Sequence, residues 1–403
     1  METNDRRDFL KKSILGVSGI ALIPETLKLS LTGRSEASRL PELPGRMLGK
    51  TGIKTPLISM GASGATNARF VRTAYDAGIK VFFSATYYGE GNNEKLVGEG
   101  LKGLPRDSYT IGTAAPPDGL DKRTGTFVKK FDTAGYLKKA EDSLKRFGLD
   151  YVDIFLFPYS GKREMVLNEG VLKAMEMLKR QGKARFVGIA SHNDTEEALR
   201  AAADSGIYDV AMAAYNYKIA NKESMNEALA YVSKAGMGIV AMKTAAGVLS
   251  EKSGQPVNIN AALKWVLQNE HISSIVSAMS NTEEMQKNLS MISNLRLSDE
   301  ELKDLALSGP ASGPTLYCHQ CKKCLSQCPY NLDIPTLMRS YMYAYGYKNL
   351  RQARYALNTV DLPLKPCNDC LECKVKCTNG FDVRSKIRDI SRLKEVPQDF
   401  LMA

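Results

Sequence analysis

The stretch YVDIFLF, residues 151–157, is apolar at every position except Asp153. A run without polar and apolar alternation is typical of a β-strand that is buried on both faces. Residues 132–147, just before it, instead repeat apolar side chains at helical spacing as far as Phe147. A helix followed by such a strand is the repeating unit of a parallel sheet flanked by helices.

Seven further segments have the same strand-like character, and helical patterns separate them. The strand-like segments are 55–61, 79–85, 108–113, 184–190, 208–213, 237–242 and 273–278. Helical patterns lie at 168–181, 194–204, 222–234 and 258–268. Eight strands alternating with helices predict an α/β fold, a TIM (β/α)8 barrel over residues 45–308. No G-x-G-x-x-G follows a strand, which argues against an open dinucleotide-binding sheet.

Two of the expected helices carry N-terminal capping patterns. Asp194 and Asn281 are expected to be N-caps, with Glu197 and Glu284 three residues later as capping-box partners. In a TIM barrel the chemistry lies at the carboxyl ends of the strands, so the candidate catalytic residues are those that follow each strand.

All eight cysteines lie in the last quarter of the chain, in two runs of spacing C-x2-C-x2-C-x3-C. The runs are Cys318, Cys321, Cys324 and Cys328, then Cys367, Cys370, Cys373 and Cys377. This spacing is that of two-cluster iron–sulfur proteins. It differs from the paired ligands of structural zinc, and disulfides across two-residue gaps would be strained. It predicts two [4Fe–4S] clusters in a small, mainly helical, ferredoxin-like domain at 315–395, after a Gly/Pro/Ser linker at 309–314.

In such proteins the fourth cysteine of each run ligates the other cluster. Cluster site 1 is therefore expected to comprise Cys318, Cys321, Cys324 and Cys377. Cluster site 2 is expected to comprise Cys367, Cys370, Cys373 and Cys328. Four lysines lie among these ligands: Lys322, Lys323, Lys374 and Lys376. They either balance cluster charge or dock an acidic electron partner, or they are simply solvated.

The first residues have the composition of an export signal. Residues 6–11, RRDFLK, precede an apolar run at 13–23, which is shorter than the roughly 20 residues of a membrane span. A small-x-small site ends at Ala37. The string resembles the twin-arginine (Tat) signal, except that Asp5 replaces its Ser or Thr. We therefore expect residues 1–37 to be a Tat signal, with the Tat machinery as a partner and no stable membrane span. The protein would then be periplasmic or otherwise exported. The alternative is that this segment is an ordinary amphipathic N-terminal helix.

Several strings in the barrel segment match one family. They are residues 46–53, 88–89, 182–188, 215–216 and 262–267. Together they resemble aldo/keto reductases over about residues 45–305. The string CPYNLDIP, residues 328–335, resembles the members that carry a C-terminal ferredoxin module.

The resemblance implies carbonyl reduction by NADPH, with a Tyr as proton donor assisted by an Asp, a Lys and a His. The Tyr is kept as Tyr88, whereas the other three positions hold Phe83, Ala114 and Pro158. A phenol is a poor acid near neutral pH without a cation beside it. The chain is therefore expected to be an oxidoreductase that does not use the family's standard chemistry, with Tyr88 as its candidate catalytic residue.

The resemblance also implies that Lys243 and Asn288 contact the phosphate and adenine of the cofactor, although each could be an ordinary structural residue. At the nicotinamide end, Ala190-Ser191 replaces a Ser-Asn pair and Ala214 replaces a Gln, while His192 is retained. NADP(H) is therefore a possible cofactor whose nicotinamide contacts are largely lost.

The formal charge of +11 is spread along the chain without a nucleic-acid-binding motif, so no nucleic acid partner is expected. Three hypotheses follow. The chain is an exported iron–sulfur oxidoreductase or electron-transfer protein that acts with a redox partner protein or a small-molecule substrate. Alternatively it is an NADPH-dependent carbonyl reductase with an attached ferredoxin module, or a non-catalytic electron carrier or scaffold. The replacements at Phe83, Ala114 and Pro158 argue against the carbonyl reductase, and the first hypothesis is preferred to the non-catalytic carrier.

Overall fold

The computed structural model describes residues 42–121, 125–219, 221–245, 258–307, 316–363, 365–370 and 372–401, without the side chains of 398 and 399. The predicted Tat signal at 1–37 and the predicted linker at 309–314 lie outside these residues. Residues 41–403 belong to one compact unit. Within the described ranges, no helix is both long and apolar enough to cross a membrane.

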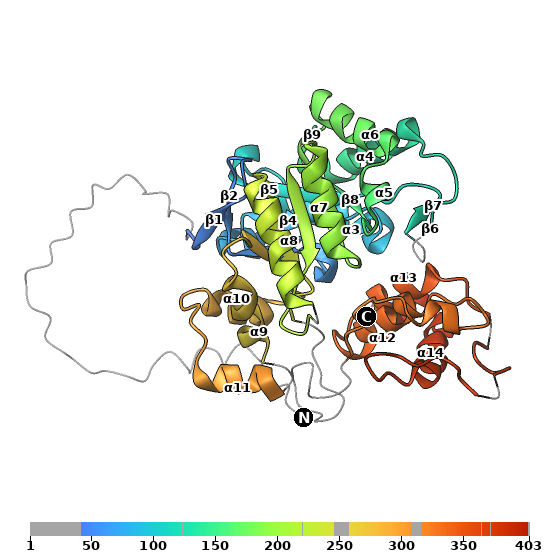
Figure 1. The fold of residues 1–403 in the computed structure, drawn as a ribbon. Helices are drawn as coiled ribbons and strands as arrows, with labels where there is room; N and C mark the ends of the chain where they lie inside the picture. The colour runs from blue at the N-terminus through green and yellow to red at the C-terminus, as the bar shows by residue number, and fades with distance from the viewer. Residues whose placement is uncertain are drawn as a thin grey trace, which may run out of the picture. The chain divides into compact units, whose positions relative to one another are not determined.

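Eight parallel strands close into a barrel, which confirms the predicted TIM-barrel fold (Figure 1). The strands are β3 (Ile58–Gly61), β4 (Val81–Phe83), β5 (Thr110–Ala114), β8 (Val152–Pro158), β9 (Ala184–Ser191), β10 (Val210–Ala214), β11 (Gly238–Met242) and β12 (Ser274–Ala278). They pair in chain order, and β12 pairs with β3 to close the ring. Two short hairpins, β1 (Gly45–Met47) with β2 (Lys54–Pro56) and β6 (Leu120–Asp121) with β7 (Thr126–Phe127), stand outside it.

Helices connect the strands and continue into the C-terminal module, residues 316–401. The barrel helices are α2 (Ala68–Asp76), α3 (Asn92–Leu101), α4 (Thr133–Phe147), α5 (Arg163–Val166), α6 (Glu169–Arg180), α7 (Thr195–Ser205), α8 (Lys222–Lys234), α9 (Ile259–Leu267), α10 (Thr282–Met291) and α11 (Asp299–Leu307). The module contains α12 (Ile334–Tyr345), α13 (Leu350–Asn358) and α14 (Val383–Ser391) around its own apolar core. Gly346, after α12, divides the helical segment into two helices.

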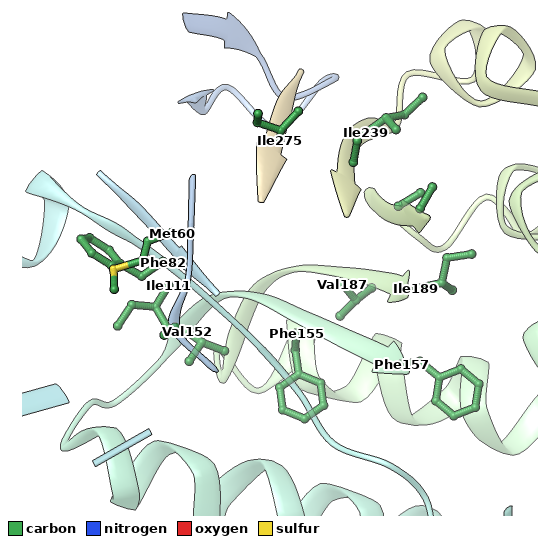
Figure 2. Packing of buried hydrophobic residues seen from close by; sticks show 14 of the residues in the cluster. Met60, Phe82, Ile111, Val152, Phe155, Phe157, Val187, Ile189, Ile239 and Ile275 are labelled. Carbon is green, nitrogen blue, oxygen red and sulfur yellow. The ribbon is translucent and has the colours of Figure 1, made fainter. Parts of the chain in front are cut away.

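Strand β8 shows why the barrel strands lack polar and apolar alternation, since all of its residues are buried. Phe155 and Phe157 extend outward from the strand (Figure 2). Both make edge contacts with Tyr136 of α4, at ring-centroid distances of 6.0 and 6.2 Å. Ile154 and Leu156, which alternate with them, pack instead inside the barrel with residues of other strands. Both faces of the strand therefore need apolar side chains.

The amino-terminal end of the barrel is plugged by Leu48, which is fully buried between β1 and β2 and joins the interior cluster. Gly238 at the start of β11 permits this close approach, because an added Cβ would lie 2.4 Å from Cγ of Leu48. With this end closed, chemistry in the barrel is restricted to the carboxyl ends of the strands.

The capping predictions had mixed outcomes. Asn281 caps α10 by accepting a hydrogen bond from the Glu284 amide at 2.9 Å, as predicted. The Glu284 carboxylate, however, accepts from the Ser280 amide at 2.8 Å, one residue before the position expected of a capping box.

Asp194 occupies the N-cap position of α7, as predicted, but its side chain makes no capping hydrogen bond to the helix. Its backbone is left-handed, with φ of 48°, and its carboxylate accepts instead from Nζ of Lys322 in the C-terminal module at 2.7 Å. Glu197, its expected partner, accepts from the Arg163 amide at 3.0 Å. A tertiary ion pair has replaced the local cap.

One buried carboxylate ties α3 and α4 to β5. Glu94 is fully buried, and its carboxylate accepts from Thr113 Oγ1 at 2.6 Å, Ser143 Oγ at 2.5 Å and Arg146 Nε at 2.6 Å. Removing the cation from such a pair leaves an uncompensated buried charge.

We expect Arg146→Met to lower the free energy of unfolding by about 3 kcal/mol, because the buried Glu94 carboxylate would lose its cationic partner. The matched control is Lys138→Met, which breaks the exposed Lys138–Asp142 pair of α4 and should cost less than about 1 kcal/mol. Urea unfolding followed by circular dichroism measures both. Equal losses in the two variants would contradict the role given to Glu94.

Candidate functional site

Cluster site 2 is a cavity of about 320 Å³ in the C-terminal module. Its lining includes all four predicted ligands, Cys328, Cys367, Cys370 and Cys373. The same four side chains are electrostatic neighbours. The pKa of Cys367 is raised most by burial, and then by the nearby Cys370, Cys373 and Cys328. The structure thus brings together the four cysteines that their spacing in the sequence assigned to cluster site 2.

Cluster site 1 is assembled in the same way. Burial first, and then Cys324, Cys377 and Cys321, raise the pKa of Cys318. Backbone amides donate to two of its sulfurs, Gln320 to Cys318 and Asn379 to Cys377, each at 3.4 Å. Iron binding would convert these thiols to thiolates, which such amides stabilise.

Cluster site 2 has room for a cubane cluster. Among the described residues, no group of three or more His, Cys, Asp or Glu side chains converges closely enough to hold one metal ion. The cysteines of cluster site 2 instead surround a volume that a four-iron, four-sulfur cluster could fill. The assignment of each ligand to its cluster stays a prediction.

Lys218, in the loop after β10, gives separate support for a negatively charged cluster at cluster site 1. It is 1% exposed, and its Nζ has no hydrogen-bond partner among the described residues. Burial lowers its pKa to about 8. Its charge acts on His319, the residue after Cys318. The Nζ of Lys218 lies over the Tyr217 ring, 5.4 Å from its centroid, but has no anionic partner in the described part of the chain. A negatively charged cluster would offset the cost of burying this cation.

The carboxyl end of the barrel, here called the barrel mouth, is covered by side chains of the C-terminal module. Tyr87 stacks on Tyr355 of α13 with ring centroids 5.6 Å apart and an interplanar angle of 16°. Lys322 pairs with Asp194 across the same boundary. Lys243 donates from Nζ to the hydroxyl of Tyr343 in α12 at 2.8 Å.

Two small cavities remain in the mouth. The first, about 10 Å³, is lined by His192, Ala214, Lys243, Tyr317, Cys318, Gln320, Arg339 and Met342. The second, about 20 Å³, is lined by Tyr87, Tyr88, Tyr159, His192, Arg339, Tyr343, Gln352, Tyr355, Ala356 and Thr359. Each has room for about one water molecule. Neither of these two cavities could hold a nicotinamide ring.

Tyr88 lies in this mouth but has an unfavourable environment for a proton donor. Burial first, and then Tyr343 and Tyr159, raise its pKa well above the ordinary value. In the part of the chain that the structure describes, no Lys or Arg is among the groups that shift this pKa. Phe83 and Ala114 are buried in the apolar barrel interior, and Pro158 is the buried last residue of β8.

The two predicted cofactor contacts have different partners. Lys243 follows β11 with a left-handed backbone, φ of 57°, and its amine is bound to Tyr343. Asn288 is buried in α10, and its amide donates to Ser277 Oγ of β12 at 3.1 Å. Lys243 is therefore engaged within the protein, whereas Asn288 holds α10 against the barrel.

Sequence reasoning missed Tyr343 and Arg339, both on α12. Burial alone would raise the pKa of Tyr343, yet the charges of Lys243 and Arg339 and the hydrogen bond from Lys243 lower it below the ordinary value. His192 lines both cavities, and burial first, then Lys243 and Arg339, lower its pKa well below the ordinary value. The helical periodicity of α12 gives no sign that Tyr343 faces a barrel.

Comparison with known proteins gives two family-model matches. Residues 58–261, about half of the chain, match the model described as the aldo/keto reductase family. Residues 317–382 match the model described as a 4Fe-4S dicluster domain.

Curated relatives align over most of their own length. L-galactose dehydrogenase of Arabidopsis thaliana is 28% identical over 293 residues, which is 62% of this chain and 88% of the plant protein. L-glyceraldehyde 3-phosphate reductase of Escherichia coli O157:H7 is 27% identical over 327 residues, 66% of this chain and 92% of that protein. An aldo-keto reductase from Bacillus halodurans, solved in its holo form, aligns with a TM-score of 0.54 at 20% identity over 66% of this chain and 96% of that one. This structural likeness shows the fold alone.

We expect Cys328→Ala to remove the cluster held by the second cysteine run, because Cys328 lines the cavity of cluster site 2. Iron content should fall by about half, and the EPR signal of the dithionite-reduced protein should lose the interaction between two clusters. Cys377→Ala is the matched variant for cluster site 1. If Cys328→Ala instead removed the cluster of its own run, the exchange of fourth ligands would be contradicted.

Proposed function

Because the chain belongs to the aldo/keto reductase family and carries a C-terminal 4Fe-4S dicluster domain, we propose that it is an exported oxidoreductase whose electrons pass through iron–sulfur clusters rather than from NADPH. The reaction site is the barrel mouth, where the C-terminal module meets the carboxyl ends of the strands. When bound, the clusters would supply single electrons to this site. Its partners are a redox protein that delivers electrons and a small-molecule substrate.

The observation that carries the proposal is the hydrogen bond from Lys243 to Tyr343. The resemblance assigned Lys243 to the cofactor phosphate, but its amine lies against a tyrosine of the module. The remaining cavities, of about 10 and 20 Å³, have room for about a water each. NADPH could bind in the family's manner only if the module left the mouth.

The apolar residues at three family positions support the same conclusion. Phe83 and Ala114 are each 4% exposed and pack with interior barrel residues, where a carboxylate or an amine would need partners. Without a cation among the groups that shift its pKa, Tyr88 would stay protonated and a weak acid at neutral pH. Standard carbonyl reduction through Tyr88 is therefore disfavoured.

The Tat-like signal fits this function. Iron–sulfur clusters are assembled in the cytoplasm, so a cluster-bearing protein has to cross the membrane already folded, which is the role of the Tat route. An exported enzyme also lacks a free NADPH pool, and clusters offer another source of electrons.

The second candidate is a conventional NADPH-dependent carbonyl reductase with an attached ferredoxin module. It is favoured by the curated relatives, which are named as a dehydrogenase and a reductase. The two candidates differ in whether the barrel binds NADPH.

We expect an anaerobic titration with NADPH, followed by nicotinamide fluorescence, to show no micromolar binding to the cluster-loaded protein. The reason is that side chains of α12 and α13 fill the mouth. A cytoplasmic aldo/keto reductase titrated in parallel is the positive control. Tight binding accompanied by aldehyde turnover would support the conventional reductase instead.

We expect residues 1–40, fused to a folded reporter, to direct Tat-dependent export, because Arg6 and Arg7 stand at the twin-arginine positions. Replacing both with Lys should abolish export while leaving reporter synthesis unchanged. Fractionation of cells with and without a functional Tat system measures this. Export that persists in the Tat-deficient cells would contradict the assignment.

A further inference from the structure

The barrel mouth contains an acid–base pair that the family resemblance does not assign. We propose that Tyr343 is the proton donor of this site, with Lys243 as its cationic partner, and that it acts on an oxygen of a quinone. The proposal rests on the proposed function, since the electrons are those that the predicted clusters would supply. It assigns the proton-donor role to a residue of the C-terminal module instead of Tyr88.

The geometry of the pair is that of an activated phenol. Nζ of Lys243 donates to the Tyr343 hydroxyl at 2.8 Å, and Tyr343 is 8% exposed. Nζ of Lys243 also lies 4.9 Å from the centre of the Tyr343 ring. The left-handed backbone of Lys243, φ of 57°, is an uncommon conformation for a residue with a side chain. A tyrosine beside a fixed ammonium loses its proton more readily, because the cation stabilises the phenolate.

The surroundings single out Tyr343 among the tyrosines of the mouth. The charged and titratable groups near it are Lys243, Arg339, His192, Tyr87, Tyr88, Tyr159, Tyr317, Tyr347 and Tyr355. Burial raises the pKa of Tyr87, Tyr88 and Tyr159, whereas the two cations outweigh burial at Tyr343. Tyr343 is therefore, among these tyrosines, the phenol best able to give up a proton.

His192 adds a polar group without adding charge. Its Nδ1 is buried and has no hydrogen-bond partner among the described residues. Because its pKa is lowered well below the ordinary value, the imidazole is neutral at neutral pH. It lines the cavity that also borders Tyr343 and the one that also borders Cys318. It is a positioning residue that can hydrogen-bond the substrate oxygen.

A quinone suits both the electron supply and the walls of the site. Iron–sulfur clusters deliver electrons one at a time, and a conjugated ring spreads an unpaired electron better than an isolated carbonyl does. The stacked pair Tyr87 and Tyr355 offers aromatic faces to a planar ring. Because the two cavities hold about a water each, a quinone ring can enter only when Tyr355 separates from Tyr87, whereas NADPH bound in the family's manner would need the whole module to leave the mouth.

The proton and electron balance is that of quinone reduction. The O–H bond of Tyr343 breaks, an O–H bond forms on one quinone oxygen, and that carbonyl becomes a C–O single bond. Lys243 and Arg339 hold the phenolate until it regains a proton from solvent, and the second quinone oxygen takes its proton from solvent. When bound, the clusters would relay the two electrons that convert the quinone to the hydroquinone, one at a time, from a low-potential one-electron donor.

The first test measures the ionisation of tyrosine against pH and does not depend on substrate turnover. In the cluster-loaded protein, the ultraviolet difference absorbance of tyrosinate should show one tyrosine that ionises below the usual pKa of about 10. Tyr343→Phe should remove this component, and Lys243→Met should move it to higher pH. Tyr345→Phe is the matched control on the same helix, because Tyr345 is exposed and stacks on Tyr341, and it should leave the component unchanged.

The second test follows the clusters themselves. Protein reduced with dithionite and then freed of it is mixed with a soluble naphthoquinone, and cluster reoxidation is followed by stopped flow. Tyr343→Phe should slow reoxidation about 100-fold, and Tyr345→Phe should not change it. In the wild type the rate should fall as pH rises through the lowered pKa of Tyr343, because the protonated phenol is the donor. Lys243→Met should move that fall to higher pH.

These outcomes distinguish a failure of the role given to Tyr343 from a failure of the proposed function. If dithionite reduces the clusters but Tyr343→Phe reacts at the wild-type rate, or the quinone reoxidises no variant, the role of Tyr343 is overturned and the proposed function stands. Loss of the reaction in Tyr88→Phe alone would return the role to Tyr88. If the wild-type clusters cannot be reduced, the proposed function fails, and the role of Tyr343 fails with it.

Discussion

The hydrogen bond between Lys243 and Tyr343 joins two parts of the molecule that are 100 residues apart in sequence. It occupies the amine that the family resemblance assigned to the cofactor. It also fixes α12 over the barrel mouth and places a cation on a buried phenol. The proposed exclusion of NADPH and the proposed choice of Tyr343 as the acid both rest on this contact.

The two predicted cluster sites stand in different relations to the barrel. Cys318 of cluster site 1 lines the cavity that also borders Lys243 and His192. The cavity of cluster site 2 is lined by residues of the C-terminal module alone. This arrangement orders the sites, with cluster site 1 next to the barrel mouth and cluster site 2 beyond it. Electrons that enter at cluster site 2 would therefore pass through cluster site 1 before they reach the mouth.

Most of the fold could be predicted from the sequence because its signals are local or periodic. Continuous apolar runs such as 151–157 mark strands buried on both faces, and the cysteine spacing anticipates the grouping of Cys328 with the second run. Local rules failed where a tertiary contact competed. Asp194 looks like a helix cap, but its carboxylate pairs with Lys322 across the boundary between barrel and module. Tyr343 carries no local signal, since its role arises only when α12 meets the end of β11.

The central claim is that electrons reach the barrel mouth from the clusters and not from a nicotinamide. Its most direct test is to mix the oxidised, cluster-loaded protein with NADPH under anaerobic conditions and to record the visible absorbance of the clusters. We expect no change with NADPH, and bleaching when a low-potential one-electron donor is added to the same sample. Bleaching by NADPH, at a rate that keeps pace with substrate turnover, would contradict the claim.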